Sequence, residues 1–178
     1  GFGGFGELPR RNKPVVCAVN GLAVGGGFEI ALAAEFVVAA EHAEFFLPEA
    51  GLGIIPDTGA VRLPRILPPA VATEVLIGGR RLDAREAERW GLVNRVVPVA
   101  DLRAAALELA GRISASAPLA VEAVLAIDRA TRHLSLEEAF AHLRSGDLEA
   151  YERMLASEDA EEGLQAFVEK RDPHWQGS

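Results

Sequence analysis

The chain has 178 residues, of which 49% are hydrophobic and 25% are charged, and its formal net charge is −8. This composition is typical of one globular domain and excludes a disordered segment. The Lys and Arg residues are dispersed among acids, so the sequence lacks the basic stripe that nucleic-acid binding requires. No run of about 18 apolar residues predicts a membrane-spanning helix, and no signal segment is apparent. The single cysteine, Cys17, excludes an internal disulfide framework and favours a cytoplasmic protein in which a buried thiol is inert.

The first part of the chain alternates between strand and helix patterns. Apolar runs ended by turn residues predict buried strands, and runs with capping residues predict short helices. Asp83 is expected to cap a helix because Glu86 follows three residues later, and Gly91 is expected to end it. The expected elements in chain order are a strand at 13–21, a helix at 26–34, a strand at 36–40, a helix at 83–91 and a strand at 93–97.

From Asp101 onward the pattern is helical throughout. Pro118 suits the first turn of a helix, Ser135 with Glu138 forms a capping box, and residues 157–171 predict a last helix. The sequence therefore predicts an α/β core over residues 1–100 followed by a helical region over residues 101–178. No linker or repeat separates them, so we expect one continuous domain.

The stretch "GLAVGGGFEIALA", residues 21–33, places three glycines directly before a helix that carries Glu29. A helix that begins at a glycine turn presents unpaired N–H groups, which can hold a ligand oxygen at Gly26. It is not a phosphate loop, because Gly27 and Phe28 occupy the positions of its Lys and Ser/Thr. A second interpretation stays open: the glycines only permit close packing, and Glu29 complements the helix dipole.

A second acid, Glu49, follows Glu29 by 20 residues in the segment "FFLPEAGLGIIPDTGAVRLPR". A carboxylate among apolar residues suits general acid–base catalysis, and two of them suggest paired roles. Together with N–H donors for an enolate-like oxygen, they suit the addition or removal of water next to a thioester. The histidines have no metal-site spacing, and no nucleophile elbow is present, so the sequence predicts neither a metal centre nor a serine hydrolase.

Three stretches carry a specific resemblance: "KPVVCAVNGLAVGGGFEIALAAEFVVAAEHAEFFLPEAGLGIIPDTGAVRLPR", "GRRLDAREAERWGLVNRVVP" and "GLQAFVEKRDP". Over essentially the whole chain the sequence resembles the enoyl-CoA hydratase, or crotonase, family. The resemblance implies a spiral of ββα units with C-terminal helices that form trimers or hexamers. It also implies an acyl-CoA substrate, a hydro-lyase activity and no cofactor, since CoA enters as part of the substrate.

The resemblance also implies roles for individual residues. Gly26 matches the position whose N–H forms half of the oxyanion hole. Glu29 matches the glutamate that handles the attacking water, and Glu49 matches the one that exchanges the proton at the α-carbon. Phe167 and Lys170 match residues that can contact the CoA of a neighbouring subunit, although a solvated last helix explains them equally well.

Two departures from the family pattern matter. The segment that supplies the second oxyanion N–H in the family precedes "KPV", and we expect it to be missing from this chain. Asp57 replaces a small residue, eight positions after Glu49, where dienoyl-CoA isomerases of the family carry a catalytic aspartate. It is expected either to bond its own backbone in a turn or to line the acyl pocket. In the pocket it could hold a quaternary ammonium group, with Phe45 or Phe46 as aromatic partner.

Three function classes therefore remain open. A hydratase or dehydratase is favoured because both glutamates are present. An isomerase of the same family would normally need only the position of Glu49. A non-catalytic fragment that binds CoA or supports oligomerisation is the third.

Overall fold

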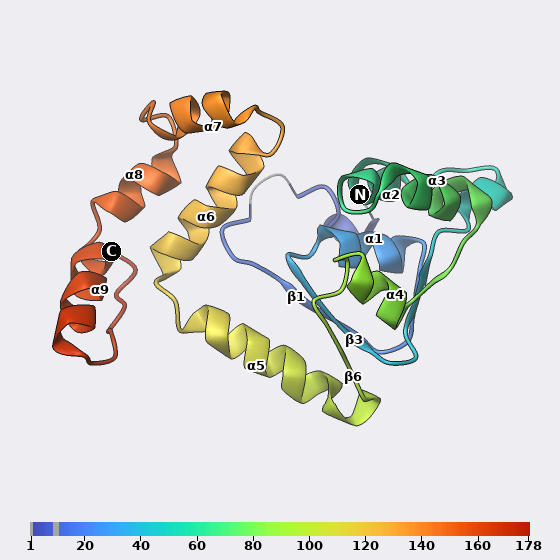
Figure 1. Ribbon diagram of the computed structural model, residues 1–178, viewed down its shortest axis with the longest axis horizontal. Helices are drawn as coiled ribbons and strands as arrows, with labels where there is room; N and C mark the ends of the chain where they lie inside the picture. The colour runs from blue at the N-terminus through green and yellow to red at the C-terminus, as the bar shows by residue number, and fades with distance from the viewer. Residues whose placement is uncertain (1, 9–10) are drawn as a thin grey trace. The chain divides into compact units, whose positions relative to one another are not determined.

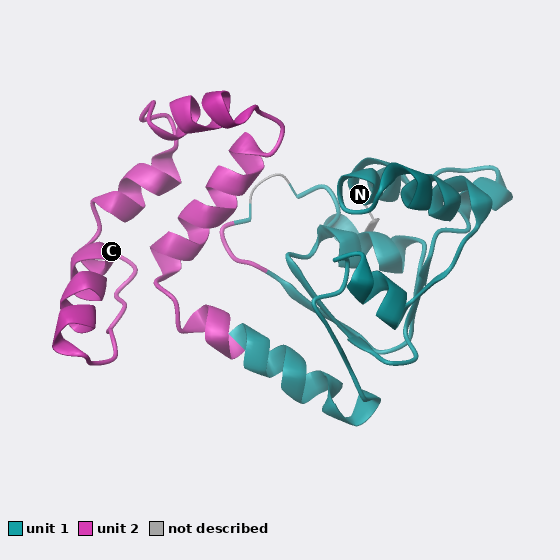
Figure 2. Ribbon diagram, viewed as in Figure 1, with its two compact units in different colours: residues 1–11, 15–110 teal, residues 12–14, 111–178 magenta. Residues whose placement is uncertain are grey.

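The computed structural model describes residues 2–8 and 11–178 (Figure 1). The chain forms two compact units, one of residues 1–11 and 15–110 and one of residues 12–14 and 111–178 (Figure 2). The sequence placed a boundary at residue 100, where the helical region begins, whereas the two units divide within helix α5 (Leu102–Ser114). The expectation of one continuous domain stays a prediction.

The described strands of the first unit form two three-stranded sheets. In one sheet, β3 (Phe36–Ala40) lies between β1 (Val16–Val19) and β6 (Arg95–Val97), and both pairings are parallel. In the other, β4 (Glu44–Phe46) pairs parallel with β2 (Leu22–Val24) and antiparallel with β5 (Leu82–Asp83). The chain thus gives one strand to each sheet, passes through a helix, and repeats the step. This is the ββα spiral that the resemblance implied.

Helices of the first unit cover these sheets, and a contiguous apolar core lies between them. The core includes Phe28 and Phe45, whose ring centroids are 5.4 Å apart, together with Leu47, Leu63 and Leu82. The helices of this unit, apart from short 3-10 turns, are α1 (Gly26–Ala33), α2 (Asp57–Arg62), α3 (Pro69–Gly78), α4 (Ala84–Arg89) and the first part of α5.

Local capping signals in the sequence are confirmed. The Asp83 side chain accepts a hydrogen bond from the Glu86 N–H at 2.7 Å and begins α4, and Gly91 has a positive φ of 79° just beyond its end. Ser135 and Glu138 form the expected reciprocal capping box of α7 (Leu136–Leu143). The positions of these helices could be predicted because the residues that begin or end each helix are its neighbours in the sequence.

The second unit is helical in its described part (Figure 2). Helix α6 (Pro118–Thr131) packs against α8 (Glu149–Leu155), and Arg153 of α8 forms an ion pair with Glu122 of α6. Helix α9 (Glu158–Glu169) begins at Ser157, whose hydroxyl accepts from the Ala160 N–H at 3.2 Å. In the described part of the chain no single helix is long and apolar enough to cross a membrane. Two consecutive segments, Val99–Ser114 and Pro118–Thr131, would qualify together by length and composition alone.

Candidate active site

A glycine joins the end of β2 to the start of α1. Gly25 is buried and has φ 53° and ψ −124°, a conformation that only glycine adopts readily. Its N–H donates to the Phe46 carbonyl of β4 at 3.1 Å, and its carbonyl accepts from the Glu29 N–H at 2.9 Å. Gly26 is then the first residue of the helix. Through these two backbone hydrogen bonds, Gly25 links β4 to the first turn of α1.

Glu29 lies in that first turn and is only 7% exposed. Its Oε1 accepts a hydrogen bond from the Gly59 N–H of α2 at 2.8 Å. A buried carboxylate needs such a donor, because losing water without compensation is costly. One oxygen of Glu29 is therefore fixed by the main chain of α2.

Glu49 begins the 3-10 turn Glu49–Leu52 after Pro48 and is half-buried. Its Oε1 lies only 2.5 Å from the position that a Cβ atom on Gly25 would occupy. Its Oε2 is buried and has no hydrogen-bond partner among the described residues. Gly25 therefore bonds the backbone of Glu29 and lies next to the carboxylate of Glu49.

The N-terminal segment packs against α2. The Arg62 guanidinium donates to the Gly6 carbonyl at 2.8 Å, and a Cβ on Gly6 would stand 2.8 Å from the Thr58 hydroxyl. Thr58 is 4% exposed, and its hydroxyl has no partner among the described residues. This packing fixes the helix whose Gly59 N–H holds Glu29.

Comparisons with known proteins agree with this geometry. A family model described as enoyl-CoA hydratase/isomerase matches residues 4–178. This chain belongs to the enoyl-CoA hydratase/isomerase family.

Sequence relatives and solved structures give more detail. The carnitinyl-CoA dehydratases of Salmonella arizonae and Citrobacter koseri are 57% and 56% identical, over 99% of this chain and 68% of their own lengths. Enoyl-CoA hydratase from Mycobacterium tuberculosis superimposes with a TM-score of 0.90 at 39% identity, over 98% of this chain and 68% of that one. Enoyl-CoA hydratase from Bacillus anthracis gives 0.87 at 39% identity, over 98% and 65%. The chain spans about two thirds of the length of these relatives, and it is an enoyl-CoA hydratase-type lyase.

Within the family, short motifs of the sequence also resemble carnitinyl-CoA dehydratase. They are "FEIALA", "PDTG", "RLPRILPP", "WGLVNRVV" and the ending "SEDAEEGLQAFVEKRDPHW". The high identity to the dehydratases of Salmonella arizonae and Citrobacter koseri agrees with these motifs. The crotonase-like recognition made from the sequence is confirmed.

Asp57 is exposed in the first turn of α2, two residues before Gly59. The turn at residues 56–59 is the first turn of this helix, in which the Ala60 N–H donates to the Pro56 carbonyl at 2.7 Å. The bond expected between Asp57 and its own backbone stays a prediction. An acid in the first turn of a helix complements its dipole. The expected acyl-pocket role of Asp57 in this family stays a prediction.

The two aromatic side chains expected to hold a quaternary ammonium differ in exposure. Phe45 is fully buried against Phe28 in the core. The Phe46 ring already has the Arg81 guanidinium 4.0 Å from its centroid. The expectation for Phe45 was wrong, since strand alternation turns it into the core. The role expected for Phe46, which has a cation on one face of its ring, stays a prediction.

Phe167 and Lys170, the expected CoA contacts, lie in the second unit. Phe167 is 84% exposed on α9, and Lys170 ends that helix in a left-handed conformation with φ 56°. Both positions are open to a ligand, and their CoA role stays a prediction. Cys17 is a half-buried free thiol whose pKa is raised by burial, which fits the inert thiol that was expected.

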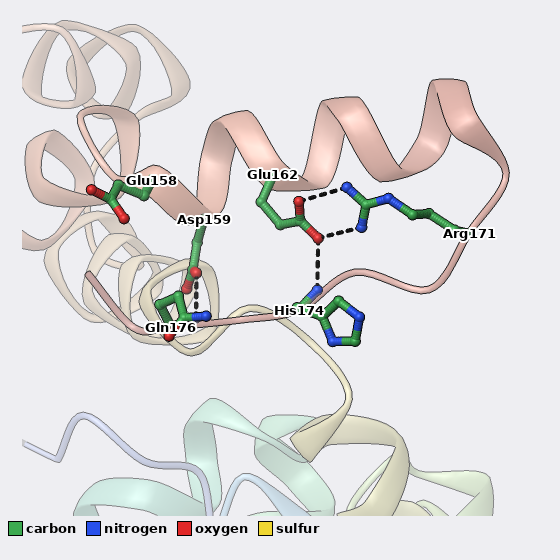
Figure 3. Close-up of a pocket in the computed structure, with 6 residues that line it drawn as sticks. All are labelled: Glu158, Asp159, Glu162, Arg171, His174 and Gln176. Atoms are coloured by element: carbon green, nitrogen blue, oxygen red, sulfur yellow. Dashed lines mark hydrogen bonds and ion pairs between the residues drawn. The ribbon is translucent and has the colours of Figure 1, made fainter.

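A cavity of about 370 Å³ lies beside α9, and its lining side chains are drawn in Figure 3. Glu162 lies between Arg171, which it binds through two nitrogens at 2.6 and 2.8 Å, and the His174 N–H at 2.7 Å. Asp159 is 1% exposed and accepts from the N–H groups of Gln176 and Gly177. Sequence reasoning missed Asp159, because only the returning tail buries it. Asp159 and Glu162 thus have structural partners within the second unit.

Proposed function

We propose that this protein adds water reversibly to a 2-enoyl-CoA and removes it from the corresponding 3-hydroxyacyl-CoA, with crotonobetainyl-CoA and carnitinyl-CoA as the preferred pair. The observation that carries the proposal is that Gly25, at the N-terminus of α1, bonds the backbone of Glu29 and lies next to the carboxylate of Glu49. Two acids and an adjacent helix N-terminus are the parts that this reaction requires. The choice of acyl group is supported by the names and identities of the dehydratase relatives.

In the hydration direction, the thioester oxygen accepts a hydrogen bond from the Gly26 N–H. Glu29, held through one oxygen by Gly59, uses its other oxygen to take a proton from water. The water oxygen bonds to the β-carbon, and the electron pair of the double bond moves toward the thioester oxygen, where the donor stabilises it. Glu49, which enters the step protonated, delivers its proton to the α-carbon, so that H and OH have been added across the double bond. The proton taken by Glu29 then passes to solvent, and Glu49 takes one up, which restores both acids.

An isomerase of the same family is the second candidate. Moving a double bond requires one acid near the α-carbon, and the position of Glu49 would suffice. The Gly59 N–H that holds a buried Glu29 in place favours the hydratase, because an isomerase would have no use for this arrangement.

Three further parts of the proposal concern the cofactor, the oligomeric state and the cellular location. CoA enters as part of the substrate, and no other cofactor or metal takes part. The protein acts as a homo-oligomer, in which Phe167 and Lys170 contact the CoA of a neighbouring subunit. A cytoplasmic location is proposed because Cys17 is a free thiol.

The first experiment follows the loss of enoyl-thioester absorbance with crotonobetainyl-CoA and crotonyl-CoA. Glu29→Gln and Glu49→Gln should each lower kcat at least about a hundredfold, because general acid–base catalysis contributes about 10² to 10⁴. Binding of the CoA thioester, measured by calorimetry, should stay nearly unchanged. Normal turnover of either variant would remove that residue from the mechanism, and a loss in Glu49→Gln alone would favour the isomerase.

A second experiment tests the oxyanion donor. Gly26→Pro deletes the N–H at a helix position where proline is well tolerated, whereas Gly26→Ala keeps it. Removing one such donor typically lowers kcat about 10² to 10³-fold. We expect that loss in the proline variant and a smaller one in the alanine variant. Equal losses would indicate that Gly26 matters for packing and not as a donor.

A further inference from the structure

Gly25 lies next to the Glu49 carboxylate, and its missing side chain leaves room for it. A Cβ atom there would stand 2.5 Å from Oε1 of Glu49 and 3.6 Å from its carboxyl carbon. Carbon and oxygen atoms in ordinary contact stay about 1 Å further apart than the shorter distance. The carboxylate of Glu49 therefore occupies space that every residue other than glycine would fill.

The atom that would be displaced is the far end of a flexible side chain. Glu49 can rotate away from a new methyl group without moving the backbone, and its Oε2 has no described hydrogen bond that would hold it in place. A methyl group at residue 25 would therefore displace the carboxylate, and it would also strain the backbone at this positive φ. Glu29 responds differently, because its backbone N–H bonds the Gly25 carbonyl and its side chain bonds Gly59.

We propose that Gly25 is a positioning residue for the reaction, because the absence of its side chain fixes where the Glu49 carboxylate stands relative to the substrate α-carbon. The proposal rests on the role proposed above for Glu49. Gly25 acts by leaving the space in which the proton donor sits.

The main test is Gly25→Ala in the whole protein. A misplacement of about 1 Å can lower a rate about a hundredfold, so kcat for crotonobetainyl-CoA should fall by about that factor while KM changes little. Gly79→Ala is a control for positive φ alone, because Gly79 has a φ of 70° and open space where its Cβ would be. Its ψ of 19° differs from the −124° of Gly25, so the strain particular to Gly25 is separated by the double mutants below.

A double-mutant comparison separates displacement of Glu49 from other effects. Glu49→Asp withdraws the carboxylate by one methylene, so Gly25→Ala should cost less than about tenfold in that background. In a Glu29→Asp background the full loss of about a hundredfold should persist. Losses of equal size in the wild-type and Glu49→Asp backgrounds would overturn the proposal, and so would a rise in KM with kcat unchanged.

Two further outcomes are informative. If Gly25→Ala fails to fold, the pair Gly25→Ala with Glu49→Ala decides: recovery of folding supports a steric conflict with Glu49, and continued failure overturns the proposal in favour of backbone strain. If Glu49→Gln alone leaves turnover normal, the proposed role of Glu49 fails. If Glu49→Gln is impaired but Gly25→Ala is not, only the present inference fails.

Discussion

At the scale of single residues, the two acids of the site are held in opposite ways. Glu29 is buried, and the Gly59 N–H fixes one of its oxygens. Glu49 is half-buried, and its Oε2 has no described partner. A fixed carboxylate suits the orientation of a water molecule, whereas a carboxylate with a free oxygen suits proton exchange with carbon. This asymmetry is the physical reason for assigning them different roles.

The residue-scale prediction concerns Asp57 and the acyl group. A quaternary ammonium donates no ordinary hydrogen bond, so a negative charge or an aromatic face must hold it. Phe45 is buried and Arg81 already lies over the Phe46 ring, which favours the charge of Asp57. Asp57→Asn should lower kcat/KM for crotonobetainyl-CoA about ten to a hundredfold, as expected for a charged contact worth about 1 to 3 kcal/mol. The rate with crotonyl-CoA should stay nearly unchanged.

Comparing the two substrates provides the control for Asp57→Asn. A parallel fall with both would assign Asp57 a catalytic or structural role in α2. No fall with either would leave the carnitine assignment resting on the relatives alone.

At the scale of elements, the contact between α9 and the tail that follows it depends on charge. The Arg171 guanidinium and the His174 N–H lower the pKa of Glu162 from 4.5 to about 2. Because the folded pKa is below the unfolded one, Glu162 stabilises the docked tail fully above about pH 4.5. That contribution is lost as the pH falls toward about 2. The contact is near the surface, so its contribution is modest.

This pH dependence can be followed by the fluorescence of Trp175. Its indole donates to the Ala115 carbonyl at 2.9 Å and lies against Gly163, so release of the tail should change its emission. In a Trp90→Phe background we expect a change between about pH 4.5 and 2. Glu162→Gln should remove most of it. Identical titrations in the two proteins would assign the change to another acid, such as Glu169, whose pKa Gln165 and Arg171 also lower.

At the scale of the whole molecule, α9 carries an apolar face that the described chain does not cover. Leu164, Phe167 and Val168 follow at helical spacing and are 73%, 84% and 78% exposed. Exposed apolar patches of this kind mark interaction surfaces, and self-association is part of the proposed function. Leu164→Asp should shift sedimentation toward smaller species at micromolar concentration.

A matched variant controls for the added charge. Gln165→Asp introduces the same aspartate one position further along α9, where the side chain is exposed and polar. It should leave the sedimentation pattern unchanged. A wild-type protein that sediments as a monomer at micromolar concentration would contradict self-association, and equal effects of both variants would contradict this face as its location.

The sequence by itself determined the features whose signals are local. Three helices begin at residues whose side chain or ring suits the first turn: Asp83, Pro118 and Ser135 with Glu138. The starting points of these helices therefore follow from a few neighbouring residues. The strand at residues 36–40 and the helix that starts at Gly26 were likewise readable from apolar pattern and glycine. The family motifs identified Glu29 and Glu49 as the acids of interest.

Only the tertiary structure decided the features that depend on distant parts of the chain. The strands β2, β4 and β5 are two or three residues long and exist because partners pair with them, so no local pattern could predict them. Glu29 reaches the Gly59 N–H across 30 positions, and Glu49 reaches Gly25 only because β4 pairs beside β2. A sequence can show that two carboxylates exist, but the folded main chain sets which oxygen is held and which is free.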